Sequence, residues 1–465
     1  MDARSTDDSV QRGILFVRWT CTSGWVAGVE EWLVRHEGVD SVRMGAVVWY
    51  RMHGCAHILV PHVQHCRRSL CTLATQPFSS VMNLTDVDWL GFDLDHTLVK
   101  YKNNALGEHI FRACSRYLWE NHGYQKELLE NEVYDPAFNV RGKMWDLSTG
   151  DILQLNQTGV VTAGWHGKVR LSQAELEERY STTKPHVHFE KIKQFGRGDF
   201  FCFNDFFVSP TTQLAACLVH SVDSENEEPS GKEVYSAILS DLFCAFNGNF
   251  CPEHFQTGSG YYFQPLRDNI SKYVFDRRED QTRAWLEKIR EAPFNKKLFL
   301  LTNSNFDYSE LLLNAAYGDD WRDLFDIIIY RGAKKRGFFD QDHAEKPFLS
   351  YTRGSSVDGP PVETTLAEYV CGQQKELISG NLGELTAFLG QDARVVYFGD
   401  DVVGDIHYAK TKSSWRAVGI AEELGDEIRK LRFTTCSDQS SSFLHTAYQE
   451  AGDQVLAECR HFGSA

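Results

Sequence analysis

Residues 87–97 read VDWLGFDLDHT, a short apolar run that ends in two carboxylates. The apolar part, residues 87–92, is typical of a short buried strand that leads straight into Asp93. A carboxylate at the end of such a strand can attack a phosphoryl group and form an aspartyl-phosphate. Asp95 faces the same side, where it can protonate the leaving oxygen and later activate water. The alternative is that Asp93 and Asp95 are turn residues or helix caps.

Three further apolar runs, at residues 297–301, 325–330 and 394–398, also end in polar residues. We predict a strand for each run, with helices over residues 277–292 and 308–316. Buried strands that alternate with helices indicate an α/β fold with a parallel sheet covered on both faces. Because ligands bind at the carboxyl ends of such strands, we expect a functional site at that edge.

The second strand is followed by Thr302 and Asn303, and the third by Lys334 and Lys335. A hydroxyl and the neighbouring backbone N–H groups can hold phosphate oxygens, although Ser, Thr and Asn are also the usual helix caps. A lysine near the nucleophile would neutralise the phosphate and stabilise the transition state. We select Lys335 for this role and keep Lys334 as the neighbouring candidate. A solvated basic loop is the alternative.

The fourth strand is followed by Asp400, Asp401 and Asp405. Carboxylates this close together repel one another unless a cation joins them, and oxygen ligands suit Mg²⁺. We expect Asp400 to be a direct ligand, Asp405 to bind directly or through water, and Asp401 to face solvent.

The spacing of the motifs predicts a catalytic core made of residues 86–103 and 277–432, interrupted by an inserted α+β domain at residues 104–276. Within the insert, helices are expected near residues 172–180 and 213–219. Residues 341–364 are polar and are predicted to form a surface loop.

Residues 1–85 lack a clear apolar period and are predicted to be a poorly ordered extension, and residues 433–465 a C-terminal tail with one helix. The extension contains potential zinc ligands, whose spacing matches no standard zinc pattern. They are Cys55, His57, His62, His65, Cys66 and Cys71.

The chain has 465 residues with a formal net charge of -16, which favours two or three domains and argues against a broad nucleic-acid-binding surface. No stretch approaches the roughly 18 apolar residues of a membrane helix. The N-terminus does not resemble a signal peptide, so we expect a cytoplasmic protein with reduced thiols. The sequence leaves the oligomeric state open, a homo-oligomer included.

These motifs resemble the haloacid dehalogenase (HAD) superfamily and, within it, the cytosolic purine 5′-nucleotidase group and its relatives. The resemblance extends over about residues 87–432. The segments that carry it are GFDLDHTL (91–98), LTNSN (301–305), AKKRGFF (333–339), YFGDDVVGDI (397–406) and residues 207–218 of the insert.

The resemblance implies a HAD-like Rossmannoid sheet whose large insert closes over the substrate as a cap. It implies that Asp93 is the nucleophile and Asp95 the acid/base, and that the substrate is bound by Thr302, Asn303, Lys335 and Phe207. It implies a Mg²⁺ site formed by Asp93, Asp95, Asp400 and Asp405.

Phe207 corresponds to a residue that contacts the base in the purine nucleotidases, and the alternative is that it packs in the cap's own core beside Phe203 and Leu214. Two positions depart from the family pattern: Val208 replaces Asn, and Arg336 replaces Pro.

The expected function is hydrolysis of a nucleoside 5′-monophosphate by a Mg²⁺-dependent phosphoric monoester hydrolase, through an aspartyl-phosphate. One alternative is a phosphatase for another small phosphomonoester. The other is a binding or scaffold protein with weak chemistry on the same fold, because a fold does not prove turnover.

Overall fold

The computed structural model describes residues 15–16 and 86–422, except 225–228, 279–280, 336, 340–345, 351–361 and 372–373. The candidate zinc ligands, Arg336 and the tail at residues 433–465 lie outside the described residues. So does the rest of the predicted extension beyond Leu15–Phe16, which form the short edge strand β1.

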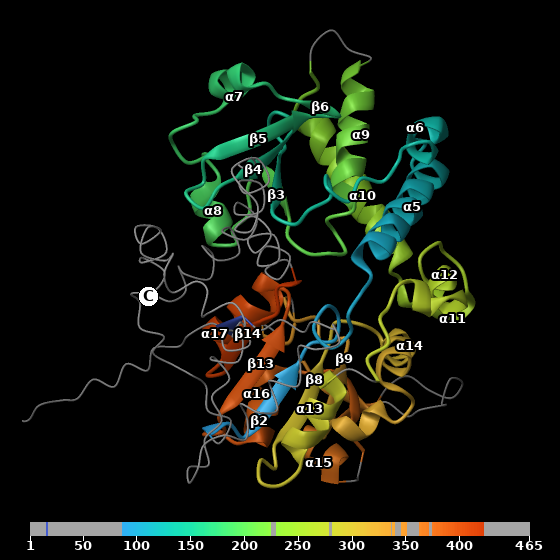
Figure 1. The fold of residues 1–465 in the computed structure, drawn as a ribbon, viewed down its shortest axis with the longest axis vertical. Coiled ribbons are helices and arrows are strands. Elements are labelled where there is room, and N and C mark those ends of the chain that lie inside the picture. Colours follow the sequence, from blue (N-terminus) through green and yellow to red (C-terminus); the bar gives the residue numbers. More distant parts are fainter. Residues whose placement is uncertain are drawn as a thin grey trace, which may run out of the picture.

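A sheet of nine strands within the described residues forms the lower half of Figure 1. Its order is β1-β14-β13-β2-β8-β9-β12-β10-β11. Neighbours from β1 to β12 pair in parallel, whereas β10 and β11 are antiparallel. The strands beyond β1 are β2 (Trp89–Phe92), β8 (Lys297–Leu301), β9 (Ile327–Tyr330), β10 (Phe348–Ser350), β11 (Glu363–Thr364), β12 (Glu376–Ser379), β13 (Val395–Gly399) and β14 (Arg416–Gly419).

The α/β fold with a largely parallel sheet is confirmed, and the four predicted strands correspond to β2, β8, β9 and β13. The predicted loop at residues 341–364 is wrong at two places, because β10 and β11 lie inside it. Phe348 on β10 is fully buried, and β10 pairs with β12.

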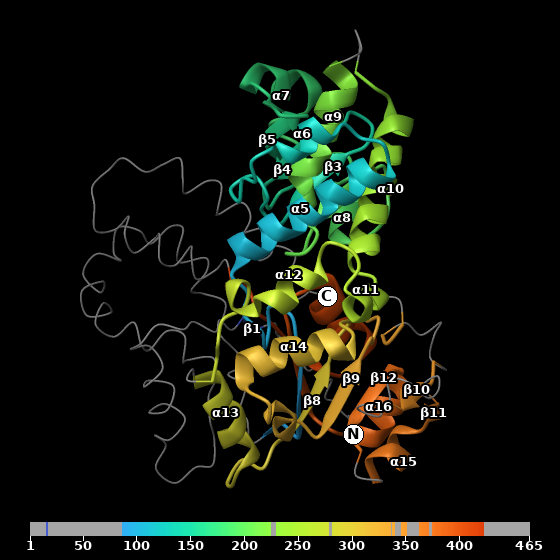
Figure 2. The same cartoon turned by 90° about the vertical axis from the view of Figure 1, so that its right-hand side faces the viewer.

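Side chains alternate between the two faces of the sheet, as the period of a strand requires. Leu90, Phe92 and Leu300 pack into one cluster, and Trp89 and Leu301 pack into the other. Helices α13 (Gln281–Arg290) and α14 (Phe306–Tyr317) cover the first face, next to a 3₁₀ turn at Trp321–Leu324. Helices α15 (Leu366–Cys371), α16 (Leu382–Leu389) and α17 (Tyr408–Lys412) cover the second. Figure 2 shows α13 and α16 on opposite sides of β8.

Between β2 and α13 the chain builds a second body, which lies above the carboxyl ends of the parallel strands in Figure 1. It contains an antiparallel sheet in the order β6-β5-β4-β3-β7. Its strands are β3 (Lys143–Asp146), β4 (Asp151–Leu155), β5 (Val161–His166), β6 (Val169–Arg170) and β7 (Phe200–Phe203). Its helices are α5 (Asn103–Asn121), α6 (Lys126–Glu130), α7 (Gln173–Arg179), α8 (Phe189–Lys193), α9 (Thr211–Ser224) and α10 (Lys232–Asn249). The predicted helices near residues 172–180 and 213–219 correspond to α7 and α9.

The chain returns to the core through α11 (Pro252–Thr257), α12 (Phe263–Asp268) and a 3₁₀ turn at Ile270–Lys272. The outgoing and returning segments then pair as a two-stranded neck. Lys102 N donates to Tyr273 O at 2.7 Å, Phe275 N donates to Lys100 O at 3.0 Å, and Tyr101 forms an antiparallel bridge with Val274. One apolar cluster continues from the sheet through this neck into α5, α9 and α10. The exact domain limits stay predictions.

Within the described residues, no helix combines the length and apolar character needed to cross a membrane. Cys114, Cys202, Cys217, Cys244 and Cys251 are free thiols.

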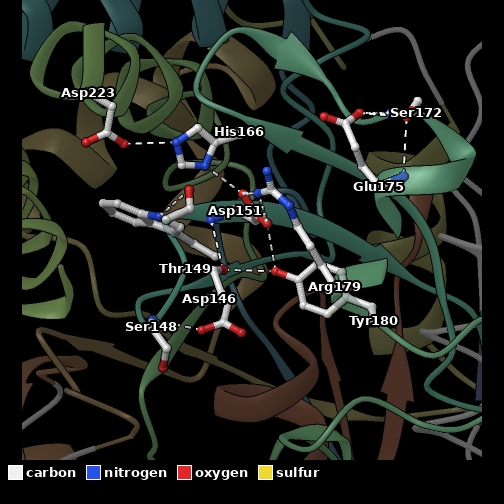
Figure 3. A network of polar contacts seen from close by, with 12 residues as sticks. Asp146, Ser148, Thr149, Asp151, His166, Ser172, Glu175, Arg179, Tyr180 and Asp223 are labelled. Atoms are coloured by element: carbon white, nitrogen blue, oxygen red, sulfur yellow. Dashed lines mark hydrogen bonds and ion pairs between the residues drawn. The ribbon is translucent and has the colours of Figure 1, made fainter. Parts of the chain in front are cut away.

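A polar network, drawn in Figure 3, ties the sheet of the insert to two of its helices. His166 on β5 lies between Asp151 on β4, at 2.7 Å, and Asp223 on α9, at 2.9 Å. Asp151 is fully buried and also accepts hydrogen bonds from Arg179 and Tyr180 at the end of α7. The hydrogen bond to Asp151 is the main reason that the pKa of His166 is raised. The His166 ring therefore links two strands and a helix.

His166→Gln should lower the melting temperature more at pH 6 than at pH 9. A pKa that is raised by folding gives stability that is fully present below the unfolded value of about 6.5, and that is lost as the pH rises through the folded pKa. Thermal unfolding at both pH values measures the difference. His188→Gln is the control, because burial lowers the pKa of His188. An equal loss at both pH values for His166→Gln would contradict the prediction.

Candidate active site

Four adjacent strands bring the four sequence motifs to one edge of the sheet. The order β13-β2-β8-β9 sets Asp93, which follows β2, between the segments that follow β13 and β8. The backbone N–H of Asp93 donates to Phe398 O on β13 at 2.8 Å, which fixes the start of the loop. This edge faces the insert in Figure 1.

Asp93 is 5% exposed, and Lys334 neutralises it. Lys334 Nζ lies 2.7 Å from Asp93 Oδ1 and also contacts Asp405 Oδ1. The same ammonium group donates to the Tyr397 hydroxyl at 3.4 Å. Burial alone would lower the pKa of Lys334, but Asp405 and Asp93 outweigh it and raise the pKa. Lys334 is therefore a buried, charged group between two carboxylates.

The lysine beside Asp93 is thus Lys334 rather than Lys335, which the sequence favoured. Ala333 has a φ of 51°, and the Lys334 backbone N–H donates to Asn303 Oδ1 at 2.8 Å, which together set the direction of the Lys334 side chain. The Lys335 side chain is 39% exposed, and its Nζ lies 2.7 Å from Asp401 Oδ2. Two adjacent lysines look equivalent in sequence, and only the backbone geometry separates them. A role of Lys335 in substrate binding stays a prediction.

Three carboxylates form the candidate metal centre. Within the described part of the chain, Asp93, Asp400 and Asp405 each offer one oxygen, and these oxygens lie within 4.8 Å of one another. Gly399 makes the approach of Asp405 feasible, because a Cβ at position 399 would lie 2.3 Å from the Cβ of Asp405. Three buried oxygen donors so close together fit a hard divalent cation such as Mg²⁺.

Electrostatics at this centre favour a bound cation. Burial is the largest cause that raises the pKa of Asp93, Asp400 and Asp405, while Lys334 at Asp93 and Asp405, and Arg141 at Asp400, act in the opposite direction. A cation that joins three such groups would lower the cost of keeping them ionised. Asp401 differs, because Lys335 outweighs the effect of burial and lowers its pKa.

Asp401 does not simply face solvent, as the sequence suggested. In addition to its ion pair with Lys335, its Oδ1 accepts a hydrogen bond from Val403 N at 3.0 Å. That bond caps the π-helical turn Val402–His407, which carries Asp405. Asp401 therefore helps to shape the loop that presents Asp405.

The Asp95 carboxylate contacts two hydroxyl groups. Its Oδ1 accepts a hydrogen bond from the Tyr101 hydroxyl at 2.5 Å, and its Oδ2 accepts one from Ser304 Oγ at 2.8 Å. Burial raises the pKa of Asp95, while these two hydrogen bonds act in the opposite direction. A metal-binding role for Asp95 stays a prediction.

Thr302 and Asn303 both stabilise the loop between β8 and α14. Thr302 Oγ1 accepts a hydrogen bond from Ser304 N at 3.0 Å, and Asn303 Oδ1 accepts the bond from Lys334 N. Helix α14 begins after Asn305, so Thr302 and Asn303 precede the cap position that was their alternative role. Substrate binding by Thr302 and Asn303 stays a prediction.

The insert contributes a cation to this edge of the sheet. The Arg141 guanidinium is buried, lies 4.0 Å from the centre of the Phe206 ring and 3.7 Å from Asp400 Oδ2, and donates to Asp400 O at 3.4 Å. The sequence analysis missed Arg141, because nothing in the sequence links an arginine on the insert to an aspartate 259 positions away.

Phe207 lies at the boundary between the insert and the core. Its ring makes edge contacts with His96 at 5.5 Å, Tyr101 at 5.8 Å and Phe250 at 5.8 Å between ring centres. His96 in turn stacks on Phe206 at 4.2 Å. These aromatic side chains flank the loop that carries Asp93 and Asp95, so Phe207 is near the candidate site. Its contact with a base stays a prediction.

Comparison with known proteins gives a consistent result. Residues 78–461 match the model of the 5′ nucleotidase family. The chain is 31% identical to 5′-nucleotidase domain-containing protein 1 of Homo sapiens over 350 residues, which are 74% of each chain. The protein of the same description from Bos taurus is 30% identical over 348 residues, again 74% of each. The 5′-nucleotidase domain-containing protein 2 of Rattus norvegicus is 27% identical over 401 residues, 85% of this chain and 68% of the rat protein.

Lys334→Met should destabilise the protein much more than Lys335→Met. Removal of Lys334 leaves Asp93 and Asp405 buried without their counter-charge, which typically costs about 3–5 kcal/mol. Lys335 is partly exposed, and the loss of such an ion pair costs about 1 kcal/mol or less. Urea denaturation in metal-free buffer measures both variants. Equal losses of unfolding free energy would contradict the assignment of Lys334 as the buried partner.

Proposed function

This chain belongs to the 5′ nucleotidase family, and from that premise we propose that it hydrolyses a nucleoside 5′-monophosphate in a Mg²⁺-dependent reaction. Membership of the family makes it a phosphoric monoester hydrolase. The observation that carries the mechanism is the buried pair of Asp93 and Lys334 beside two further carboxylates at one sheet edge.

In the first half-reaction, a carboxylate oxygen of Asp93 attacks phosphorus while the bond from phosphorus to the leaving oxygen breaks. Asp95 donates its proton to that leaving oxygen, so the nucleoside departs as an alcohol. In the second, water attacks the phosphorus of the aspartyl-phosphate, Asp95 takes a proton from the water, and Asp93 is released with inorganic phosphate. Lys334 offsets the negative charge that gathers around phosphorus in both steps.

Asp93, Asp400 and Asp405 would hold Mg²⁺ through carboxylate oxygens. When bound, the ion screens the carboxylate from the phosphate and stabilises charge on the phosphoryl oxygens. Asp400 also carries the contact to Arg141, so the metal centre and the insert meet at one residue. Loss of Asp400 should therefore impair both metal binding and the seating of the insert.

The choice of a nucleotide is supported by the names of the relatives and by the aromatic side chains near the site. Phe207 can stack on a base, and an aromatic face discriminates weakly among bases because it reads no hydrogen-bonding groups. Val208 occupies the position of a polar residue in the family pattern. That replacement favours a second candidate, another small phosphomonoester bound in the same site.

A panel of phosphomonoesters tests the function directly. We expect the purified full chain to release inorganic phosphate from at least one nucleoside 5′-monophosphate, to need Mg²⁺, and to lose turnover in excess chelator or with Asp400→Ala. If the protein hydrolyses another phosphomonoester but no nucleoside 5′-monophosphate, the second candidate becomes the proposed substrate. No turnover of any ester would contradict the proposed hydrolase activity. Full activity in excess chelator would contradict the Mg²⁺ requirement.

Asp93→Asn should abolish turnover while the protein stays folded. An amide cannot attack phosphorus to form the aspartyl-phosphate, so we expect a loss of at least about a thousandfold in kcat. Asp88→Asn is the matched control, since Asp88 precedes β2 at its opposite end and pairs with Arg394. Circular dichroism checks the fold of both variants. Activity of Asp93→Asn within tenfold of the parent would contradict the assignment of Asp93 as the nucleophile.

A further inference from the structure

Both carboxylate oxygens of Asp95 are held by hydroxyl groups from different parts of the fold. Tyr101 lies in the neck and donates to Oδ1 at 2.5 Å, and Ser304 lies after β8 and donates to Oδ2 at 2.8 Å. The torsion that rotates a carboxyl group about its last bond is broad and only weakly restrained on its own. Two donors, one on each oxygen, define the plane of the group.

Tyr101 is the first member of a chain of buried tyrosines. Its hydroxyl lies 3.2 Å from that of Tyr308 on α14, and the Tyr308 hydroxyl lies 2.9 Å from that of Tyr262. The three side chains are between 0% and 5% exposed. Burial, the largest cause, raises the pKa of all three, so each phenol keeps its proton and can act as a hydrogen-bond donor.

The neck fixes Tyr101 from the backbone side as well. Tyr101 bridges Val274, and its neighbours on both sides are bonded across the neck. At the other end of the tyrosine chain, the backbone carbonyl of Tyr262 is hydrogen-bonded by His109 on α5 at 2.7 Å. The position of the Tyr101 hydroxyl is therefore fixed both by the paired backbone of the neck and by the buried tyrosines that contact it.

We propose that Tyr101 is a positioning residue for the acid–base step, and that with Ser304 it holds the Asp95 carboxyl so that its proton points at the leaving oxygen. The inference rests on the proposed function. Tyr101 takes no part in bond making: the proton moves from Asp95 to the leaving oxygen as the bond from phosphorus to that oxygen breaks. Asp95 becomes a carboxylate at that moment, and the Tyr101 and Ser304 hydroxyls donate to it.

This role predicts a dependence on the leaving group that a purely structural tyrosine would not produce. A nucleoside alcohol leaves poorly unless it is protonated, whereas p-nitrophenolate leaves readily without a proton. The ratio kcat/KM reports the first transfer of phosphate to Asp93, so it isolates the step in which Asp95 acts as an acid. Misplacement of the acid should therefore reduce kcat/KM in proportion to how much the leaving oxygen needs the proton.

The experiment measures kcat/KM of the full chain and of Tyr101→Phe with a nucleoside 5′-monophosphate, phenyl phosphate and p-nitrophenyl phosphate. Phenylalanine keeps the ring that packs on His96 and Phe207 and removes only the hydroxyl. We expect a loss of about tenfold to a hundredfold for the nucleotide and of at most about threefold for p-nitrophenyl phosphate.

Two further variants complete the design. Ser304→Ala removes the donor to the other oxygen of Asp95 and should show the same ordering of losses, which keeps the inference testable if Tyr101→Phe fails to fold. Tyr235→Phe is the matched control, because Tyr235 is also buried and donates to an aspartate, Asp223, at 2.8 Å, but within the insert. It should leave all three values of kcat/KM unchanged.

Equal losses on the three esters, or no loss on any, would overturn the role of Tyr101 and leave the proposed function standing. An unchanged Ser304→Ala would overturn the paired-donor arrangement. If the parent protein hydrolyses none of the esters, the proposed function falls and the inference falls with it.

Discussion

The ammonium group of Lys334, shared between two buried carboxylates, is the contact on which the candidate site depends. Asp93 and Asp405 come from different strands, and both would be costly to bury without this cation. The surrounding structure serves to bring the three groups together. Asn303 orients the backbone of Lys334, and Gly399 leaves the space that Asp405 fills. The parallel strands β13, β2 and β9 all end at the same edge of the sheet, which brings these loops together.

The insert meets this edge with charges of both signs. Arg141 brings a cation to Asp400, and Asp205 brings a carboxylate whose field acts on Lys335. The Asp205 side chain is held in its loop by hydrogen bonds from Phe207 N and Val208 N. The charges of the insert therefore complement those of the core, which favours one orientation of the insert on the core over others. The aromatic contacts of Phe206 and Phe207 add apolar area to the same junction.

The sequence predicted the sheet well because its central strands are continuous apolar runs, a signal that does not depend on tertiary context. It also placed Asp93, Thr302 and Asp400 at strand ends, where the structure has them. It selected Lys335, whereas Lys334 lies beside Asp93, because that choice depends on a backbone turn at Ala333 with positive φ. It gave no signal for Tyr101, whose importance comes from a bond to Asp95 and from pairing with a segment more than 170 residues away.

The insert is attached to the core at a charged junction and at the neck. At the charged junction, the buried Arg141 guanidinium lies against Asp400, and the field of Asp205 acts on the partly exposed Lys335 side chain. The neck is held by backbone hydrogen bonds and by the buried hydroxyl chain from Tyr101 to Tyr262, where a broken bond would leave an unsatisfied polar group. Because Tyr101 belongs to the neck and donates to Asp95, the geometry of Asp95 is tied to this attachment.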